Sequence, residues 1–160
     1  MIRTTFVASL ALAVYSAIPA AADSKGGPGH GHETFSAGEP GNPKRPARIV
    51  QVTMNEGDGK MMFIPDRVEV KRGEQVKFVL RNKGALDHEF ILATTDENLK
   101  HAEDMKRFPD MEHDDPNGKR LAPKKADEIV WRFTKPGQFE FGCLIPGHRE
   151  SGMTGTIVVK

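Results

Sequence analysis

Short runs of alternating polar and apolar residues fill this chain from residue 49 to its end. A period of two is the pattern of a strand with one buried face, because successive side chains point to opposite sides. The runs are separated by turn-forming Gly, Pro, Asn and Asp, and they lie at residues 49–54, 61–64, 67–71, 76–80, 88–92, 129–133, 139–141 and 157–159. Several short strands joined by turns predict an all-β, antiparallel sandwich.

One segment interrupts this pattern. Thr94 and Glu97 have the spacing of a capping box, in which a threonine and a glutamate bond each other's backbone N–H at a helix start. Residues 98–107 contain few β-forming residues, and Pro109 follows them. The sequence therefore predicts a short helical insertion around residues 95–108, followed by a turn-rich loop at 113–118.

The amino-terminal residues have the composition of an export signal. A basic Arg3 precedes a mainly apolar run at 6–18 and three alanines at 20–22. This order predicts a cleaved signal peptide over residues 1–22, with an uncleaved anchor as the alternative. The apolar run is short for a membrane span, which needs about 20 residues, so no stable membrane insertion is expected.

Residues 23–47 are rich in Gly and Pro and predict a flexible arm or an irregular strap ahead of a folded domain at 48–160. The arm carries His30 and His32, which would bind a metal loosely or be incidental in a solvated tail. The chain has 23 basic and 22 acidic side chains, and loss of Arg3 with the signal peptide balances them. This balance argues against electrostatic capture of nucleic acid.

Cys143 is the chain's one cysteine, so it has no partner for an internal disulfide. His148 and Met153 follow it at successive five-residue steps, and Pro146 and Gly147 suit a tight bend between them. His88 lies on a remote strand, at a position that shares its parity with buried residues. Two imidazoles, one thiolate and one thioether are the ligands of a mononuclear blue-copper centre.

Each of these residues alone has an ordinary explanation, as a core residue or a packing residue. Together, His88, Cys143, His148 and Met153 predict a copper site. Zinc gains little from a thioether and prefers several cysteines in structural sites. A dinuclear copper site would need a second cysteine, and the surroundings of Cys143 lack the signature of a papain-like nucleophile.

A weak second copper site is a further hypothesis. The segment 101–113 contains His101, Met105, Met111 and His113, which are soft or borderline ligands. Their spacing forms no compact chelate, and methionine in a helix more often serves packing. Ligation by this segment or by His30 and His32 therefore stays open beside the packing explanation.

The stretches at 82–90 and 141–153 resemble the copper-binding stretches of the cupredoxins, and the similarity covers about residues 47–160. It is closest to the plastocyanin/azurin-like periplasmic proteins of copper tolerance, which residues 111–117 and 128–131 also resemble. The resemblance implies a Greek-key β-sandwich with type 1 copper at one end. It also implies the four ligands named above. Glu89 departs from the family pattern, in which Asn or Ser often follows the first histidine.

Two functions follow from the resemblance. One is a periplasmic copper-tolerance protein that binds copper ions and cycles them between Cu(I) and Cu(II), with oxidation of Cu(I) as one option. The other is a dedicated, soluble electron carrier whose redox partner docks near His148, on an apolar patch of Leu144, Ile145, Pro146 and Gly152. Both describe a monomeric electron-transfer protein. An enzyme such as a copper nitrite reductase is disfavoured, because a second cupredoxin domain would be needed to complete its catalytic site.

Overall fold

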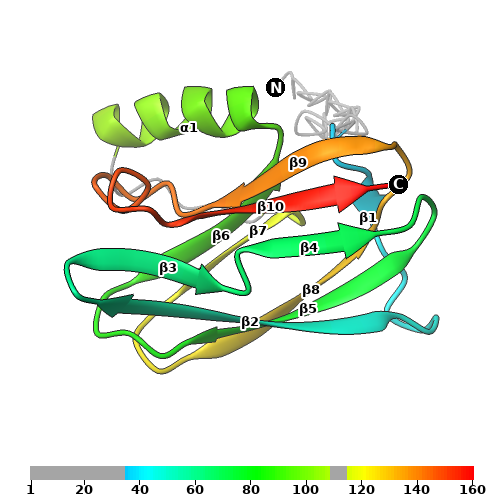
Figure 1. Ribbon diagram of the computed structural model, residues 1–160, viewed down its shortest axis with the longest axis horizontal. Helices are drawn as coiled ribbons and strands as arrows, with labels where there is room; N and C mark the ends of the chain where they lie inside the picture. The colour runs from blue at the N-terminus through cyan, green and yellow to red at the C-terminus, as the bar shows by residue number, and fades with distance from the viewer. Residues whose placement is uncertain (1–34, 109–114) are drawn as a thin grey trace, which may run out of the picture. The chain divides into compact units, whose positions relative to one another are not determined.

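The computed structural model describes residues 35–108 and 115–160, which form a two-sheet β-sandwich with one helix (Figure 1). One sheet has the order β1-β8-β5-β2-β3 and the other β4-β10-β9-β6-β7. The elements are β1 (Glu39–Pro40), β2 (Arg48–Gly57), β3 (Lys60–Ile64), β4 (Arg67–Val70), β5 (Gln75–Asn82), β6 (His88–Ala93), α1 (Thr95–Arg107), β7 (Gly118–Leu121), β8 (Ala126–Arg132), β9 (Gly137–Gly142) and β10 (Thr154–Val159).

The prediction of an all-β sandwich with a helical insertion is confirmed, with one difference in strand direction. Strands β2 and β5 pair in parallel, as do β4 and β10, whereas the remaining neighbours are antiparallel. Between β2 and β5 the chain crosses to the other sheet at β4 and returns. Local alternation marks which face of a strand is buried but carries no information on its direction.

The inward faces of both sheets meet in one apolar core. In β5, Val76, Phe78 and Leu80 are fully buried, as their alternation predicts. The rings of Phe90 and Phe141 stack with centroids 5.0 Å apart, on neighbouring strands β6 and β9. Each fully buried side chain of this size contributes about 1.5–3 kcal/mol. The two strands that lead to the predicted metal ligands are therefore held by packing as well as by pairing.

Helix α1 covers the outer face of the second sheet. Thr94 caps it by accepting from the backbone N–H of Glu97, and the Glu97 side chain accepts from Thr94 in return, so the predicted capping box is present. Met105 and Ala102 pack with Ile91 of β6 and with Leu144. Strand β6 is consequently buried on both faces from His88 to Leu92. No helix in the described ranges has the length and apolar character needed to cross a membrane.

Two segments were not predicted as ordered strands. Strand β7 begins at the last residue of the predicted loop and pairs with β6, placing Leu121 opposite His88. The part of the predicted arm from Phe35 onward lies against the domain: β1 pairs with β8, and Ala37 is buried and accepts a hydrogen bond from Trp131 Nε1 at 3.2 Å. The predicted signal peptide and the rest of the arm fall outside the described residues.

Candidate metal centre

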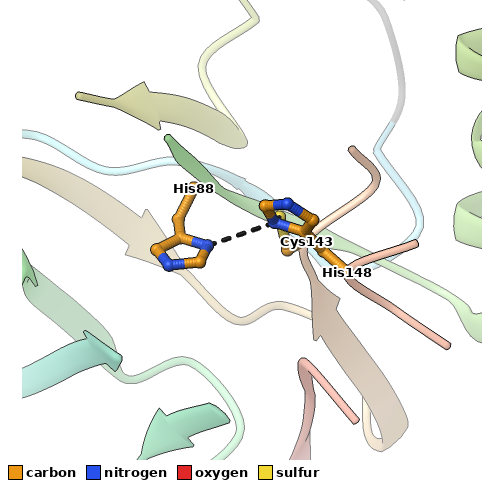
Figure 2. Close-up of side chains that lie close together, drawn as sticks. All are labelled: His88, Cys143 and His148. Carbon is orange, nitrogen blue, oxygen red and sulfur yellow. Dashed lines mark hydrogen bonds between the residues drawn. The ribbon is translucent and has the colours of Figure 1, made fainter. Parts of the chain in front are cut away.

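His88, Cys143 and His148 converge on one point inside the domain (Figure 2). Nδ1 of His88 lies 3.2 Å from Nδ1 of His148, which in turn lies 3.3 Å from Sγ of Cys143. The possible ligand atoms of all three residues lie within 4.8 Å of one another. In the described ranges, no other group of three or more His, Cys, Asp and Glu side chains comes this close.

Neighbouring strands place the first two of these residues. His88 is the first residue of β6, and Cys143 follows the last residue of β9, which pairs with β6. Cys143 lies two residues after Phe141, continues the inward parity of Phe139 and Phe141, and is fully buried. The backbone N–H of Glu89 donates to Sγ of Cys143 at 3.3 Å, which ties the two strands together at the site.

His148 is held by the turn between Cys143 and Met153. Its N–H donates to the carbonyl of Ile145 at 3.0 Å, and its carbonyl accepts from the N–H of Met153 at 3.1 Å. Gly147 has φ +88°, a left-handed conformation that glycine adopts without steric cost. The turn therefore points the imidazole back toward β6, and the side chain is 8% exposed.

Met153 lies beside the three converging residues. Its carbonyl accepts from the N–H of Cys143 at 3.1 Å, and its N–H bonds His148, so its backbone contacts both. Its side chain is fully buried in the same apolar cluster as Cys143. All four residues that the sequence singles out thus occupy one end of the sandwich.

Cys143 and His148 favour their neutral forms when no cation is present. Burial raises the pKa of Cys143 to about 12, although the N–H of Glu89 opposes this. Burial also lowers the pKa of His148, as does the nearby charge of His88. A metal cation would reverse the preference at the sulfur, because it displaces the thiol proton.

Glu89 follows His88 where the family often has Asn or Ser. Its side chain is fully buried, and Oε1 lies 3.9 Å from Nη1 of Arg120, the residue opposite it on β7. The backbone N–H of Glu89 still reaches the sulfur of Cys143. The departure therefore changes the side chain packed beside the site without removing the N–H···S contact.

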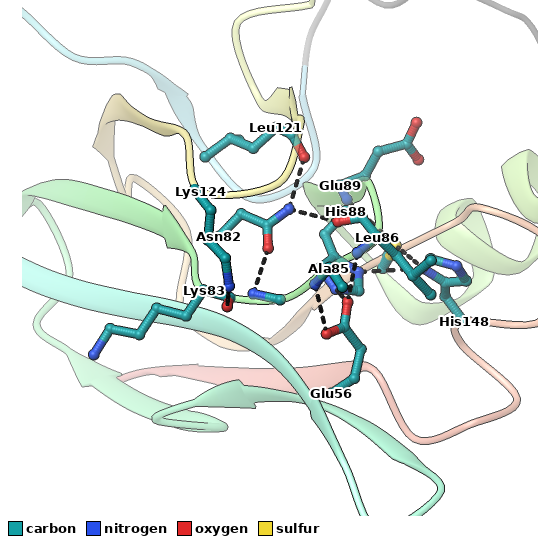
Figure 3. A network of polar contacts seen from close by, with 12 residues as sticks. Glu56, Asn82, Lys83, Ala85, Leu86, His88, Glu89, Leu121, Lys124 and His148 are labelled. Carbon is teal, nitrogen blue, oxygen red and sulfur yellow. Dashed lines mark hydrogen bonds and ion pairs between the residues drawn. The ribbon is translucent and has the colours of Figure 1, made fainter.

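Glu56 is a neighbour of the site that the sequence does not predict (Figure 3). Its Oε1 lies 2.7 Å from Nε2 of His88, and its carboxylate accepts from the N–H groups of Ala85 at 2.9 Å and Leu86 at 3.0 Å. Burial acts to raise the pKa of Glu56, but the backbone hydrogen bonds and His88 lower it overall. Nothing in the sequence marks this contact, because the two residues are 32 positions apart.

Asn82 organises the loop that leads into His88. Its amide donates to the carbonyls of Leu86 at 2.7 Å and Leu121 at 2.9 Å, and its oxygen accepts from Gly84 N–H at 2.9 Å. The turn at residues 82–84 is visible in the sequence. The contact with Leu121 is not, because it depends on the unpredicted strand β7.

The structure bears on two further sequence predictions. Met105 is fully buried among apolar side chains, which supports packing over ligation, and His101 lines a cavity of about 360 Å³ beside α1. His30, His32, Met111 and His113 lie outside the described residues. Leu144, which was predicted to belong to an apolar docking patch near His148, is 1% exposed because it packs under α1, so its place in that patch is wrong.

A family model for copper-binding proteins of the plastocyanin/azurin family matches residues 50–160. The chain belongs to this family. A relative from Rubrivivax gelatinosus, named copper-resistant cuproprotein CopI, is 46% identical over 132 residues, covering 82% of this chain and 78% of the relative. A protein of the same name from Pseudomonas aeruginosa is 32% identical over 168 residues, covering 87% and 89%.

Among solved structures, auracyanin B is similar to this cupredoxin with a TM-score of 0.62 and 20% identity, over 78% of this chain and 96% of that chain. At this identity the likeness shows the fold alone. Copper is the metal of the family, and the converging thiol and imidazoles fit it, because thiolate and imidazole are the ligands of mononuclear copper sites.

Proposed function

We propose that this protein binds one copper ion through His88, Cys143 and His148, with Met153 as a weak fourth ligand, and that it serves copper tolerance. The observation that carries the proposal is the convergence of one thiol and two imidazoles at a buried point, with a methionine beside them. The relatives named copper-resistant cuproproteins support the physiological role.

Bound copper would supply one-electron exchange between Cu(I) and Cu(II). The protein's part is to hold its ligands in one arrangement. Pairing of β6 with β7 holds His88, and a backbone hydrogen bond from the Cys143 N–H to the Met153 carbonyl holds Cys143. The Glu89 N–H would stabilise a thiolate by donating to its sulfur. Burial of all four side chains keeps water from the site, so a change of oxidation state needs little rearrangement of the protein.

The proposal includes export. Residues 1–22 would act as a cleaved signal peptide, and the mature protein would work as a periplasmic monomer that binds and transfers rather than catalyses. The apolar run at 6–18 and the alanines at 20–22 support this.

A dedicated electron carrier is the second candidate, and the exposure of the His148 turn favours it. Pro146, Gly147 and Gly152 are exposed and Ile145 is half-buried around the 8% exposed imidazole. A redox partner would dock there, close to His148.

The metal assignment is tested by titrating the purified protein with Cu(II). We expect one equivalent to bind and to give an intense visible band from charge transfer between the Cys143 sulfur and copper. Cys143→Ser should abolish the band, whereas Met105→Leu, which alters a buried sulfur outside the site, should keep it. A colourless wild-type complex would contradict the assignment.

The physiological role is tested by deleting the gene and measuring growth across a copper series. Copper sensitivity with intact respiration, rescued by the wild type and not by Cys143→Ser, would support copper tolerance. A respiratory defect at ordinary copper concentrations would support the electron carrier instead.

A further inference from the structure

We propose that Glu56 is a positioning residue of the copper site. Its carboxylate holds the proton of His88 on Nε2 and so turns the Nδ1 lone pair toward Cys143 and His148. The inference rests on the proposed function in one respect, namely that His88 is a copper ligand. It goes beyond that function by assigning the tautomer and orientation of this ligand to a residue of another strand.

The two ring nitrogens of His88 face different partners. Nε2 lies 2.7 Å from Oε1 of Glu56, and Nδ1 lies 3.2 Å from Nδ1 of His148. An ionised carboxylate only accepts hydrogen bonds, so the nitrogen facing Glu56 must be the donor. In a neutral imidazole the other nitrogen then carries the lone pair, and this is the nitrogen on the side of Cys143.

Glu56 is itself fixed by two backbone amides. Leu86 N–H donates to Oε1, and Ala85 N–H donates to Oε2, so both oxygens are oriented by the loop that precedes His88. Glu56 belongs to β2 of the first sheet, and His88 to β6 of the second. The contact therefore joins the two sheets at the site (Figure 3).

Gly84 leaves the space that this arrangement needs. A Cβ atom at position 84 would lie 2.2 Å from Oε1 and 2.3 Å from Oε2 of Glu56. The carboxylate end of a flexible side chain would have to move to relieve such a clash. Gly84→Ala therefore displaces the carboxylate while keeping the glutamate side chain itself, which gives a test independent of changing Glu56.

Carboxylates that orient a ligating histidine typically account for about a 10–100-fold difference in metal affinity. We expect Glu56→Gln and Gly84→Ala each to weaken copper(II) binding by about this factor. The carboxylate also makes the imidazole a better donor to Cu(II), so both variants should have a higher reduction potential than the wild type.

The deciding experiment uses the copper-free protein and ¹⁵N NMR of the histidine rings. The wild type should show His88 as the Nε2–H tautomer, and both variants should lose that preference; copper affinity is then measured on the same samples. Glu74→Gln is the matched control. The Glu74 side chain is 23% exposed, against 22% for Glu56, and it also accepts a backbone N–H, that of Lys71. Glu74 precedes β5, whereas the loop bound by Glu56 follows it, so the control lies at the other end of that strand.

A wild-type Nδ1–H tautomer would overturn the proposal, and so would unchanged tautomer and affinity in both variants. The tautomer of His88 is measured without copper, so it tests the role of Glu56 separately from the proposed copper binding. A correct tautomer with no copper binding would contradict the proposed function alone. A visible copper band that both variants keep at wild-type affinity would contradict the role of Glu56 alone.

Discussion

The two histidines of the site are held in different ways. His88 lies on a strand, is fully buried, and has both ring nitrogens in contact with named partners, Glu56 and His148. His148 lies on a turn flanked by exposed residues and is 8% exposed. One side of the site is therefore an anchor within the sandwich, and the other is the side closest to solvent and to any partner.

The His148 side depends on side chains from the helical insertion. Arg149 forms a bidentate salt bridge with Glu140 of β9, in which Nη2 lies 2.9 Å from Oε2. The side-chain amide of Asn98 of α1 also donates to Glu140, at 3.0 Å. Leu144 packs against Met105 of the helix. The turn is thus braced against α1, whereas the His88 side depends on strand pairing and on the loop fixed by Asn82.

Removal of each imidazole should reveal the largest difference between the His88 side and the His148 side. His88→Gly and His148→Gly should both lose the visible copper band. Added imidazole should restore most of it in His148→Gly, because that vacancy opens next to exposed Pro146 and Gly147, and little of it in His88→Gly, whose vacancy is enclosed. Absorption spectra during an imidazole titration measure this. Equal rescue of the two variants would show that the sides do not differ in access.

The next largest effect is expected at the brace of the His148 turn. Arg149→Met leaves Glu140, which is 8% exposed, without its cation, and an unpaired carboxylate with this little exposure costs about 3 kcal/mol. Denaturant unfolding of the copper-free protein measures the loss. The double variant Arg149→Met with Glu140→Gln should recover part of it, because no unpaired charge remains. If the double variant is as unstable as the single one, packing rather than charge explains the loss.

The sequence predicted the elements whose signals are local. The capping box of Thr94 and Glu97 located the helix, and period-two runs located most strands. The convergence of His88, Cys143 and His148 also followed, because their parity and five-residue spacing limit where the side chains can point. Strand β7, the parallel pairs and the contact of Glu56 with His88 did not follow, because each joins distant segments. Leu144 was misplaced because its burial requires α1 to lie over the turn.

A smaller loss is expected on the His88 side when Asn82 is replaced. Asn82→Ala leaves the carbonyls of Leu86 and Leu121 and the Gly84 N–H without their partner. The expected cost is about 2 kcal/mol, because the Leu86 carbonyl is only partly buried and water can replace the amide there. Asn42→Ala is the control, because the exposed Asn42 also accepts from a backbone N–H two residues on, at 2.9 Å. Unfolding free energies of the two variants should differ clearly. Equal values would show that the loop before His88 needs no such support.

The smallest expected effect is the pH-dependent contribution of Glu97, in the first turn of α1, to the free energy of unfolding. Burial acts to raise the pKa of Glu97, but hydrogen bonds from Ser36 and Thr94 lower it overall. A lowered pKa in the folded state means that the carboxylate stabilises the fold above its unfolded pKa, and that this contribution is lost as pH falls through the folded value. Glu97→Gln should therefore cost about 0.5 kcal/mol at pH 7, since the exposed group is screened by water, and progressively less as the pH falls below the unfolded value of about 4.3 and through the lower folded value.

Hydrogen exchange shows which side of the site this effect reaches. If α1 braces the His148 side alone, Glu97→Gln should speed amide exchange in the turn at 143–153 at pH 7 and leave the loop at 83–87 unchanged. Faster exchange in both would mean that the two sides open together. The anchor and the braced turn would then be one cooperative unit, even though separate contacts hold each histidine.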